Sequence, residues 1–437
     1  MTGGIQNIWR IPELRTRILF TFAMLAVYRI GCVIVTPGIN SAVIRDFFSQ
    51  MSGTMFGMLN MFSGGAMEQL SIFALGIMPY ISATIIFQLL TVVIPALEAL
   101  KKEGEQGQKK INQWSRYATI VLALFQSFLM ALALENGQFG EGAVLNPGWS
   151  FRIVTMITLT SGTAFIMWLG EQVTERGIGN GISLIIFSGI VVSIPSGLSN
   201  LLDMIRTDQF TPLEAILVLA FALVVVGAVV FVERGQRRIP IQHARRAVGK
   251  QVAQGGMSYF PLRVNSAGVI PPIFASSLLM FPMTIRQFSD SPAVQSFIDR
   301  FLNPGDLSYN LIYVALIIFF CFFYTAIIIN PVDVSENIKR SGGYIPGVRP
   351  GKTTAEYIDK VLSRLTLIGA VYIALVCVLP VILSTRMNVP FYFGGTALLI
   401  VVGVSLDTVG QIDAHMVSRH YEGFVKGAGR VRGRLGQ

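Results

Sequence analysis

Residues 54–95 read TMFGMLNMFSGGAMEQLSIFALGIMPYISATIIFQLLTVVIP, and this stretch decides the fold. It is mostly apolar and about forty residues long, twice the roughly 20 residues that cross a bilayer once. It also contains a Ser-Gly-Gly at 63–65, the acidic Glu68 and, deep in its second part, Pro79. This pattern predicts a short half-helix that enters the membrane and turns back, followed by one full span. Irregular backbone at that depth is tolerated only inside protein or beside a water-filled cavity, so the stretch suggests a pore.

The composition is that of an integral membrane protein. Of 437 residues, 52% are apolar and only 13% are charged, whereas soluble domains carry about 25% charged residues. The long apolar runs are typical of helices and not of barrel strands. The polar residues 1–12, with no small-residue cleavage site after the first apolar run, predict no signal peptide. Cys32, Cys321 and Cys377 lie in apolar runs, which predicts packed thiols and no disulfide.

The apolar runs predict ten membrane spans. The fold class is therefore an all-α polytopic membrane protein with ten transmembrane helices. We expect the spans at residues 18–36, 71–97, 117–134, 153–170, 182–198, 215–232, 266–285, 311–331, 365–385 and 391–406.

The basic residues fix the orientation of these spans. The odd-numbered connections carry five of the 34 Lys and Arg residues, whereas the termini and the even-numbered connections carry 27. Positive charge is retained on the cytoplasmic side, so both termini are expected in the cytoplasm. The same parity requires residues 54–95 to cross the membrane only once. The five basic residues of the odd-numbered connections are Arg45, Arg206, Arg286, Arg300 and Arg386.

Two cytoplasmic loops, residues 233–263 and 331–364, are long and basic. One interpretation is retention of positive charge together with attraction to anionic lipids. The other is a docking surface for an acidic or RNA-rich partner, because clustered Arg side chains bind phosphates and carboxylates. Helix connections need only a few residues, so the length of the loops slightly favours the second interpretation.

Ten spans divide into two sets of five, and an odd number per half implies that the halves are inverted relative to one another. Pro79 interrupts the second span of the first half, and Pro271-Pro272 interrupt the second span of the other. Interrupted helices at matching positions indicate where a translocation path lies between the halves. The expected parts are an N-terminal cytoplasmic segment (1–17), a first half (18–198), an external connection (199–214), a second half (215–406) and a basic cytoplasmic tail (407–437).

No motif predicts an enzyme. Residues 347–353 (GVRPGKT) resemble a phosphate-binding loop, but three residues separate the glycines where four are required, and no strand is expected before them. Residues 177–181 (GIGNG) lie between two spans and predict a tight, flexible turn instead of a dinucleotide site. His243, His415 and His420 lack metal-ligand spacing. We expect no catalytic residues, no metal and no cofactor.

An ion-coupled secondary transporter with inverted repeats is the alternative function. Such transporters keep charged side chains at depth to bind the coupling ion. Nine of the ten expected spans contain no Asp, Glu, Lys, Arg or His. This composition disfavours a transporter, and it favours a channel whose gate opens and closes through apolar contacts.

Several strings resemble the SecY family, the protein-conducting channel subunits of the bacterial Sec translocon. The resemblance covers nearly the whole chain in order and is weakest in the external connections. The strings are NMFSGG (60–65), SIFALGIMPYIS (71–82), MWLGEQ (167–172), TERGIGNGIS (174–183), FVERGQRR (231–238), AGVIP (267–271) and PFYFGGT (390–396).

The resemblance implies a central pore with a ring of apolar side chains at its waist. Ile77 with Ile81, and Ile182 with Ile186, are pairs four residues apart, so each pair faces one way on a helix. Six β-branched side chains would exclude water and limit ion leak in the closed pore. The ring residues that the resemblance implies are Ile77, Ile81, Ile182, Ile186, Ile273 and Ile400.

The resemblance also implies a re-entrant plug half-helix at about residues 56–70 and a lateral gate toward lipid. Gly64 and Gly65 would let the plug hinge away from the ring. The plug residues expected from the resemblance are Phe56, Asn60, Phe62, Ser63, Gly64, Gly65 and Leu70. Those expected at the lateral gate are Ser82, Thr84, Gln88, Asn265 and Phe281.

The family's function and partners complete the expectations. The resemblance implies translocation of unfolded secretory polypeptides across the bacterial inner membrane and lateral release of hydrophobic segments. The implied partners are SecE, SecG, the SecA motor, the ribosome with contact to its RNA, signal sequences and anionic lipids, with no small-molecule substrate. SecA or the ribosome would dock on Arg237, Arg238, Arg245, Arg246, Arg349 and Lys352.

Overall fold

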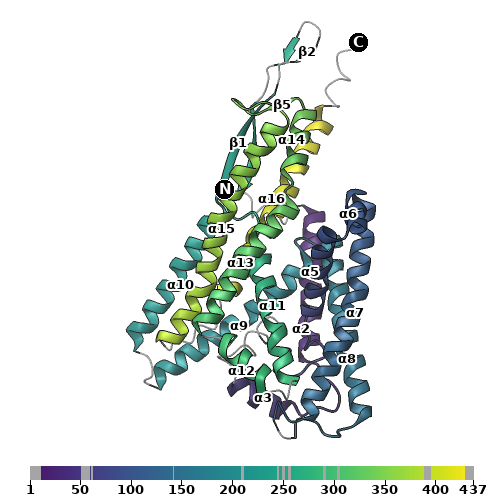
Figure 1. Ribbon diagram of the computed structural model, residues 1–437, viewed down its shortest axis with the longest axis vertical. Coiled ribbons are helices and arrows are strands. Elements are labelled where there is room, and N and C mark those ends of the chain that lie inside the picture. The colour runs from purple at the N-terminus through teal and green to yellow at the C-terminus, as the bar shows by residue number, and fades with distance from the viewer. Residues whose placement is uncertain are drawn as a thin grey trace. The chain divides into compact units, whose positions relative to one another are not determined.

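The chain forms two compact units, Met1–Asn200 with Val404–Gln437, and Leu201–Gly403. Both consist mainly of long apolar helices, which are labelled in Figure 1. The computed structural model describes residues 11–50, 60, 63–140, 142–207, 211–243, 246–248, 251–253, 257–288, 292–302, 306–387 and 395–428.

Helices make up most of the described part of the first unit. Its long helices are those expected from the first five apolar runs, and the end of α16 joins them. Its helices are α2 (Pro12–Val33), α3 (Ser41–Gln50), α5 (Met78–Val93), α6 (Pro95–Lys102), α7 (Glu105–Glu135), α8 (Trp149–Arg176), most of α9 (Gly181–Arg206) and the later part of α16 (Gly395–Ala428).

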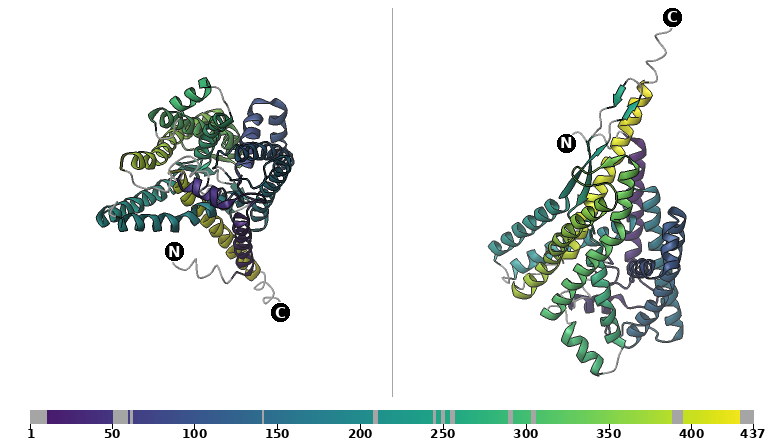
Figure 2. Two further views of the ribbon diagram at one scale, coloured as in Figure 1. Left: turned by 90° about the horizontal axis from the view of Figure 1, so that it is seen from below. Right: turned by 45° about the horizontal axis from the view of Figure 1, so that its top comes forward.

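Helices α7 and α8 lie side by side (Figures 1 and 2). The reason is a stripe of mostly small side chains at every fourth position of α7, which lets the helix backbones approach closely. The Ser127 and Thr160 hydroxyls meet across this contact at 3.3 Å. The buried residues of the stripe are Gly107, Ile111, Ser115, Thr119, Ala123, Ser127 and Ala131.

The turn at residues 177–181 is tight, as expected, but neighbouring helices hold it firmly. Asn180 caps α9, since its Oδ1 accepts the Ile182 amide at 3.1 Å. The Ile178 amide donates to Thr21 Oγ1 of α2 at 3.0 Å. The Gly179 amide donates to Gln411 Oε1 of α16 at 2.8 Å. The turn therefore joins three helices of the first unit.

The second predicted span begins later than expected. Helix α5 starts at Met78, and Pro79 occupies its first turn, where a proline removes no intrahelical hydrogen bond. Pro79 therefore starts the helix and does not break it. The helix ends at Val93, and α6 continues after a bend of 98° at Pro95.

The second unit contains the remaining apolar helices. Helix α11 also begins at its prolines, because Pro271 and Pro272 lie in its first turn, so the expected interruption of a span is again a helix start. Its helices are α10 (Pro212–Glu233), α11 (Ile270–Phe288), α12 (Pro292–Phe301), α13 (Leu307–Ile328), α14 (Pro331–Arg340), α15 (Lys352–Met387) and the first part of α16.

The described residues thus place a helix at each of the ten predicted spans. Eight helices are long and apolar enough to cross a membrane alone. The bent pair α5 and α6 adds a ninth crossing, and the shorter apolar part of α11 (Ile270–Leu279) occupies the position of the tenth. The predicted residues 391–394 of the last span lie outside the described part.

The two long basic loops are structured, which the sequence analysis missed. A three-stranded antiparallel sheet has the order β4 (Met257–Arg263), β1 (Gln236–His243), β5 (Gly343–Tyr344). Strands β2 (Arg246–Val248) and β3 (Gln251–Ala253) form a separate hairpin. The short strand β5 also precedes residues 347–353, contrary to expectation, although their glycine spacing still differs from that of a phosphate loop.

A small apolar core holds the sheet on α14 and on the start of α15. The buried Ile239 and Ile241 alternate with the exposed Arg238 and the half-buried Pro240 and Gln242 on β1, the period-two pattern of a half-buried strand. Helix α15 begins at Lys352, well before the expected span. The core consists of Ile239, Ile241, Leu262, Ile338, Ile345, Ile358, Val361, Leu362 and Leu365.

Candidate functional site

Residues 63–77 of the first unit form a compact series of turns that leads into α5. The Asn60 side chain organises it: Oδ1 accepts the Glu68 amide at 2.9 Å, and Nδ2 donates to Glu68 Oε2 at 3.1 Å. The Asn60 carbonyl accepts the Gly65 amide at 2.8 Å. Ser63 Oγ accepts the Met67 amide at 3.2 Å. Buried polar groups are therefore paired locally where no regular helix satisfies them.

The expected plug covers part of these turns. Ser63 and Leu70 are buried, and Leu70 has the left-handed φ of 42°. The described residues 63–70 form turns and not a helix. Phe56 and Phe62 lie outside the described residues.

The backbone of residues 70–72 is joined to the chain that follows α2. The Ile72 amide donates to the Ile34 carbonyl at 2.9 Å, and the Thr36 amide donates to the Leu70 carbonyl at 3.0 Å. Val35 and Ser71 form an isolated antiparallel bridge. These contacts resemble a short ladder between strands, so they satisfy backbone groups that would otherwise be buried unpaired.

Two side chains of α2 contact the start of the turns. The Tyr28 hydroxyl donates to the Ser63 carbonyl at 3.0 Å, and Arg29 Nη1 donates to the Gly64 carbonyl at 2.7 Å. Neither Tyr28 nor Arg29 is among the site residues expected from the sequence. The available signal was a charged residue in an apolar run, because such residues are costly there and are usually retained for a specific contact.

The ring residues lie on four helices. Ile77 caps α5, and the Ile81 amide donates to its carbonyl at 3.1 Å, so these two buried side chains are one turn apart. Ile182 and Ile186 are one turn apart on α9. In the second unit, Ile273 is half-buried on α11 and Ile400 is buried on α16. That all six side chains converge stays a prediction.

The polar residues expected at the gate have different surroundings. On α5, the Thr84 hydroxyl donates to the Tyr80 carbonyl at 2.8 Å, Ser82 is half-buried, and the buried Oε1 of Gln88 has no hydrogen-bond partner among the described residues. Phe281 lies on α11, and its side chain is outside the described part.

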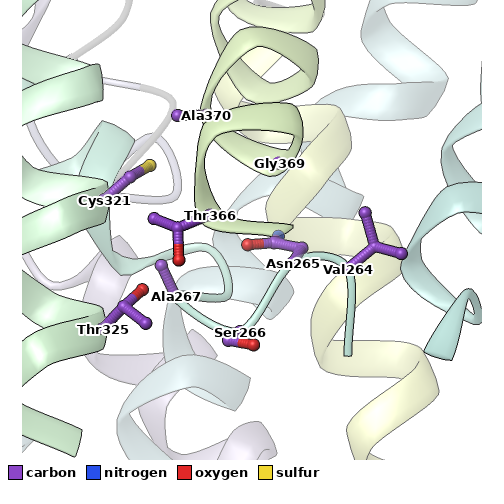
Figure 3. Close-up of a pocket in the computed structure, with 9 residues that line it drawn as sticks. All are labelled: Val264, Asn265, Ser266, Ala267, Cys321, Thr325, Thr366, Gly369 and Ala370. Carbon is purple, nitrogen blue, oxygen red and sulfur yellow. The ribbon is translucent and has the colours of Figure 1, made fainter. Parts of the chain in front are cut away.

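Asn265 is buried in the second unit, in the loop that enters α11 (Figure 3). Its Nδ2 donates to Glu233 Oε1 at 2.8 Å and to the Gly268 carbonyl at 3.1 Å, and its Oδ1 accepts the Gly268 amide at 3.0 Å. The end of α10 and the start of α11 are therefore joined through one side chain. Thr325 and Thr366 line the adjacent narrow pocket, and their hydroxyls have no described partner.

The basic residues expected to dock partners are mostly exposed. Arg237 and Arg238 lie on β1, and Arg349 and Lys352 lie at the turn that begins α15. The Arg349 carbonyl accepts the Thr354 hydroxyl at 2.8 Å, which holds the turn without using the guanidinium group. Arg246 lies on β2, with its side chain outside the described part, and Arg245 lies outside the described residues.

Among the residues that the structure describes, no group of three or more His, Cys, Asp or Glu side chains could hold a metal ion. Cys32, Cys321 and Cys377 are free and buried, in agreement with the expected thiols.

The fold and this site define a class of protein: a polytopic α-helical membrane protein with irregular backbone packed among its helices, typical of channels and transporters. The SecY family model matches residues 71–409. The chain belongs to the SecY family.

Relatives of known name support this assignment over nearly the whole chain. The protein translocase subunit SecY of Escherichia coli K12 is 50% identical over 96% of this chain and 95% of its own length. The subunit of Haemophilus influenzae is 49% identical over 95% of each chain. That of Aquifex aeolicus is 42% identical over 98% of this chain and 100% of its own. The chain is therefore a translocase subunit, and the alternative of an ion-coupled transporter is rejected.

Solved structures share the fold. A protein-conducting channel matches with a TM-score of 0.66 at 19% identity, covering 92% of this chain and 93% of the other. Sec61 in a canine ribosome-channel complex matches with a TM-score of 0.61 at 18% identity, over the same shares. The expected all-α polytopic fold is confirmed.

Proposed function

We propose that the chain conducts unfolded secretory polypeptides across the bacterial inner membrane and releases hydrophobic segments laterally into lipid. The observation that carries this proposal is the 50% identity, over 96% of the chain, to the E. coli translocase subunit SecY. The energy would come from partners or from the membrane potential. The two halves, residues 18–198 and 215–406, would be inverted repeats on either side of the pore.

The pore would be sealed at its waist by the six isoleucines of the predicted ring. The two pairs in the first unit support this role, because each places two β-branched side chains one turn apart on a helix. A ring of such side chains excludes water from a narrow constriction, so ions do not pass until a polypeptide displaces the side chains.

Serine at Ile77, Ile81, Ile182 and Ile186 tests the seal. In vesicles containing the assembled translocase, the variant should leak ions several-fold faster, because hydroxyls keep water in the constriction. Matched controls are Ile86→Ser on α5 and Ile194→Ser on α9, whose side chains are exposed. Equal leak from the ring variant and the controls would reject the ring.

The segment of residues 56–70 would act as the plug that covers the ring in the closed state. A structural relative with a TM-score of 0.64 at 19% identity, over 92% of this chain and 93% of its own, is described as a SecY protein whose plug domain stabilises the closed state and maintains a membrane seal. The direct continuation of residues 63–77 into α5 and its ring residue Ile81 supports a similar role here.

The lateral gate would involve Ser82, Thr84, Gln88, Asn265 and Phe281. The unpaired Oε1 of Gln88 supports this, because a buried amide oxygen without a partner is available to a neighbouring helix or to an arriving signal sequence. A weakly polar seam would open for an apolar segment when that segment binds the open state more tightly.

The cytoplasmic sheet and the turn at Arg349 would dock the SecA motor and the ribosome, including its RNA. Exposed guanidinium groups at Arg237, Arg238 and Arg349 support this, because arginine binds both carboxylates and phosphates in a forked geometry. The Sec61 relative was solved in a ribosome-channel complex. SecE and SecG would complete the complex, and the basic residues near the membrane would also attract anionic lipids. Both termini and the even-numbered loops would face the cytoplasm.

Charge reversal at Arg349 tests docking. We expect Arg349→Glu to reduce SecA-driven export several-fold while the channel still inserts and assembles, since its guanidinium group has no structural contact in the described part. Lys339→Glu, an exposed position in the same basic loop, is the matched control. If both variants lose export equally, the loop acts only through its overall charge.

A further inference from the structure

The start of the re-entrant turns is clamped from two sides in the first unit. Tyr28 and Arg29 donate to the consecutive carbonyls of Ser63 and Gly64. A Cβ on Gly64 would lie 2.8 Å from Arg29 Nη1 and 3.0 Å from Gly189 Cα of α9. Gly64 also has a φ of 70°, which other residues rarely adopt. Only a glycine fits between α2 and α9 at this point.

The later part of the turns is equally closely packed. The ring of Phe73 occupies the space beside Gly31 of α2, where any Cβ would overlap it. Phe73 also stacks on Tyr28 at 5.9 Å and on Phe165 of α8 at 6.0 Å between ring centroids. Tyr28 therefore holds the turns at two places, through its hydroxyl and through its ring.

Backbone also meets backbone on the α8 side. A Cβ on Gly162 would overlap the Ile72 carbonyl, so α8 and the turns approach as closely as two chains can. Together with the bridge between Val35 and Ser71, these contacts join the turns to α2, to α8 and to the chain after α2. Moving residues 63–77 as a unit would break all of these contacts at once.

We propose that Tyr28 and Arg29 are positioning residues that hold residues 63–77 as a stationary base, which keeps its place when the channel opens. This inference rests on the proposed sealing role of the re-entrant segment. It replaces the expected hinge at Gly64 and Gly65 by a fixed point, because Tyr28 and Arg29 hold the carbonyls of Ser63 and Gly64.

A disulfide between the two ends of the base tests whether these ends stay together when the channel opens. A Cβ on Gly76 would lie 3.7 Å from Ser63 Cβ, within the range that a disulfide requires. Ser63→Cys with Gly76→Cys would be made in full-length chain with the three native cysteines changed to alanine. In assembled translocase vesicles, a secretory precursor should then be translocated at the same rate in the oxidised and the reduced form. Slower translocation on oxidation, restored by a reductant, would overturn the proposal.

A second cysteine pair links the base to the chain after α2, so it reports whether the base moves as a unit. Val35→Cys with Ser71→Cys uses the isolated bridge and avoids the left-handed φ of Gly76. A hinge at residues 64–65 and a stationary base both predict that this disulfide leaves translocation unchanged. If the 63–76 disulfide slows translocation, the two ends of the base move apart; if the 35–71 disulfide slows it, the base moves relative to the chain after α2, and either result shows that the proposal is wrong.

Arg29 and Tyr28 are tested through the seal of the resting channel. Arg29→Leu should raise ion leak several-fold in the absence of precursor, and Arg29→Lys, which keeps a donor, should restore most of the seal. Tyr28→Phe keeps the ring stack and removes only the hydroxyl, so its leak should lie between that of wild type and that of Arg29→Leu. If Arg29→Leu seals normally while the serine ring variant leaks, the positioning role of Tyr28 and Arg29 is wrong and the proposed channel stands. If neither variant leaks, the proposed seal itself is wrong.

Discussion

The segments that precede α5 and α11, which we call their lead-ins, are both irregular backbone, but different contacts hold them in place. Each helix starts at a proline, and each is preceded by irregular backbone with a left-handed glycine, Gly76 or Gly268. The lead-in to α5 is long and is held from outside by α2 and α8. The lead-in to α11 is short and is held by its own Asn265, which bonds to Glu233 and Gly268.

In both lead-ins, a backbone carbonyl also packs against a glycine of a neighbouring helix, where a side chain would leave no room. Gly162 of α8 meets the Ile72 carbonyl, and Gly369 of α15 meets the Val264 carbonyl. The difference is in degree, because an added Cβ would overlap the first carbonyl but would lie 2.7 Å from the second. The comparison shows that irregular backbone in a membrane protein needs a fixed partner, which can be a neighbouring helix or a single amide side chain.

The largest expected effect is that of the two glycines. Gly162→Ala should destabilise the protein by about 3 kcal/mol and Gly369→Ala by about 1 kcal/mol, because overpacking against backbone cannot be relieved by a rotamer change. Thermal unfolding of the purified variants in detergent shows which substitution destabilises the protein more. Gly227→Ala on α10, with no atom within 4 Å of the added Cβ, is the control and should be neutral or stabilising. Equal losses at residues 162 and 369 would erase the difference between the lead-ins.

Asn265 gives the next effect. Asn265→Ala removes three hydrogen bonds and should lower the free energy of unfolding by about 2 kcal/mol. The neighbouring Ser266→Ala removes one hydrogen bond from a half-buried hydroxyl and should change it by at most about 1 kcal/mol. Hydrogen exchange at the start of α11 should rise in the first variant only. Unchanged exchange there would mean that the lead-in to α11 is held by packing and not by this amide.

The smallest effect belongs to one hydroxyl of the first lead-in. Tyr28→Phe keeps the stack on Phe73 and removes one hydrogen bond, so the expected loss is about 1 kcal/mol. Tyr259→Phe on β4, whose ring is exposed, is the matched control and should lie within about 0.5 kcal/mol of wild type. A loss as large as that of Asn265→Ala would indicate that the first lead-in also depends on a single residue.

The helices of this fold could be read from the sequence, because their apolar runs are long and the charges alternate between connections. The residues at which the helices start could not be predicted from the sequence. Pro79 and Pro271-Pro272 indicate equally a break within a helix and the first turn of one, and only the contacts of the preceding backbone decide between them. The sheet was missed although β1 alternates Ile239 and Ile241 with polar residues, because its core is completed by α14 and α15, far along the chain.

The site was predictable to the same degree. The resemblance selected Ile77, Ile81, Ile182 and Ile186, and their spacing predicted that each pair faces one way on its helix. The contacts of Tyr28 and Arg29 with Ser63 and Gly64 join residues 35 positions apart, and no local pattern records such a distance. Asn265 was selected for a gate by resemblance, whereas its partner Glu233 lies 32 residues earlier, just before β1, at the end of the strand pair where β4 finishes.

The shortness of α5 has a consequence for the surrounding bilayer. Its 16 residues extend about 24 Å at 1.5 Å per residue, less than the roughly 30 Å of a typical hydrocarbon core. The helix alone is therefore mismatched to the membrane. The turns of residues 63–77 make up the missing depth on one side, and the 98° bend into α6 turns the chain away from the α5 axis on the other. A thicker bilayer would exceed the length of α5 before it exceeded that of the longer α7 or α8. Lipid chain length should therefore influence the conformation of the channel through α5.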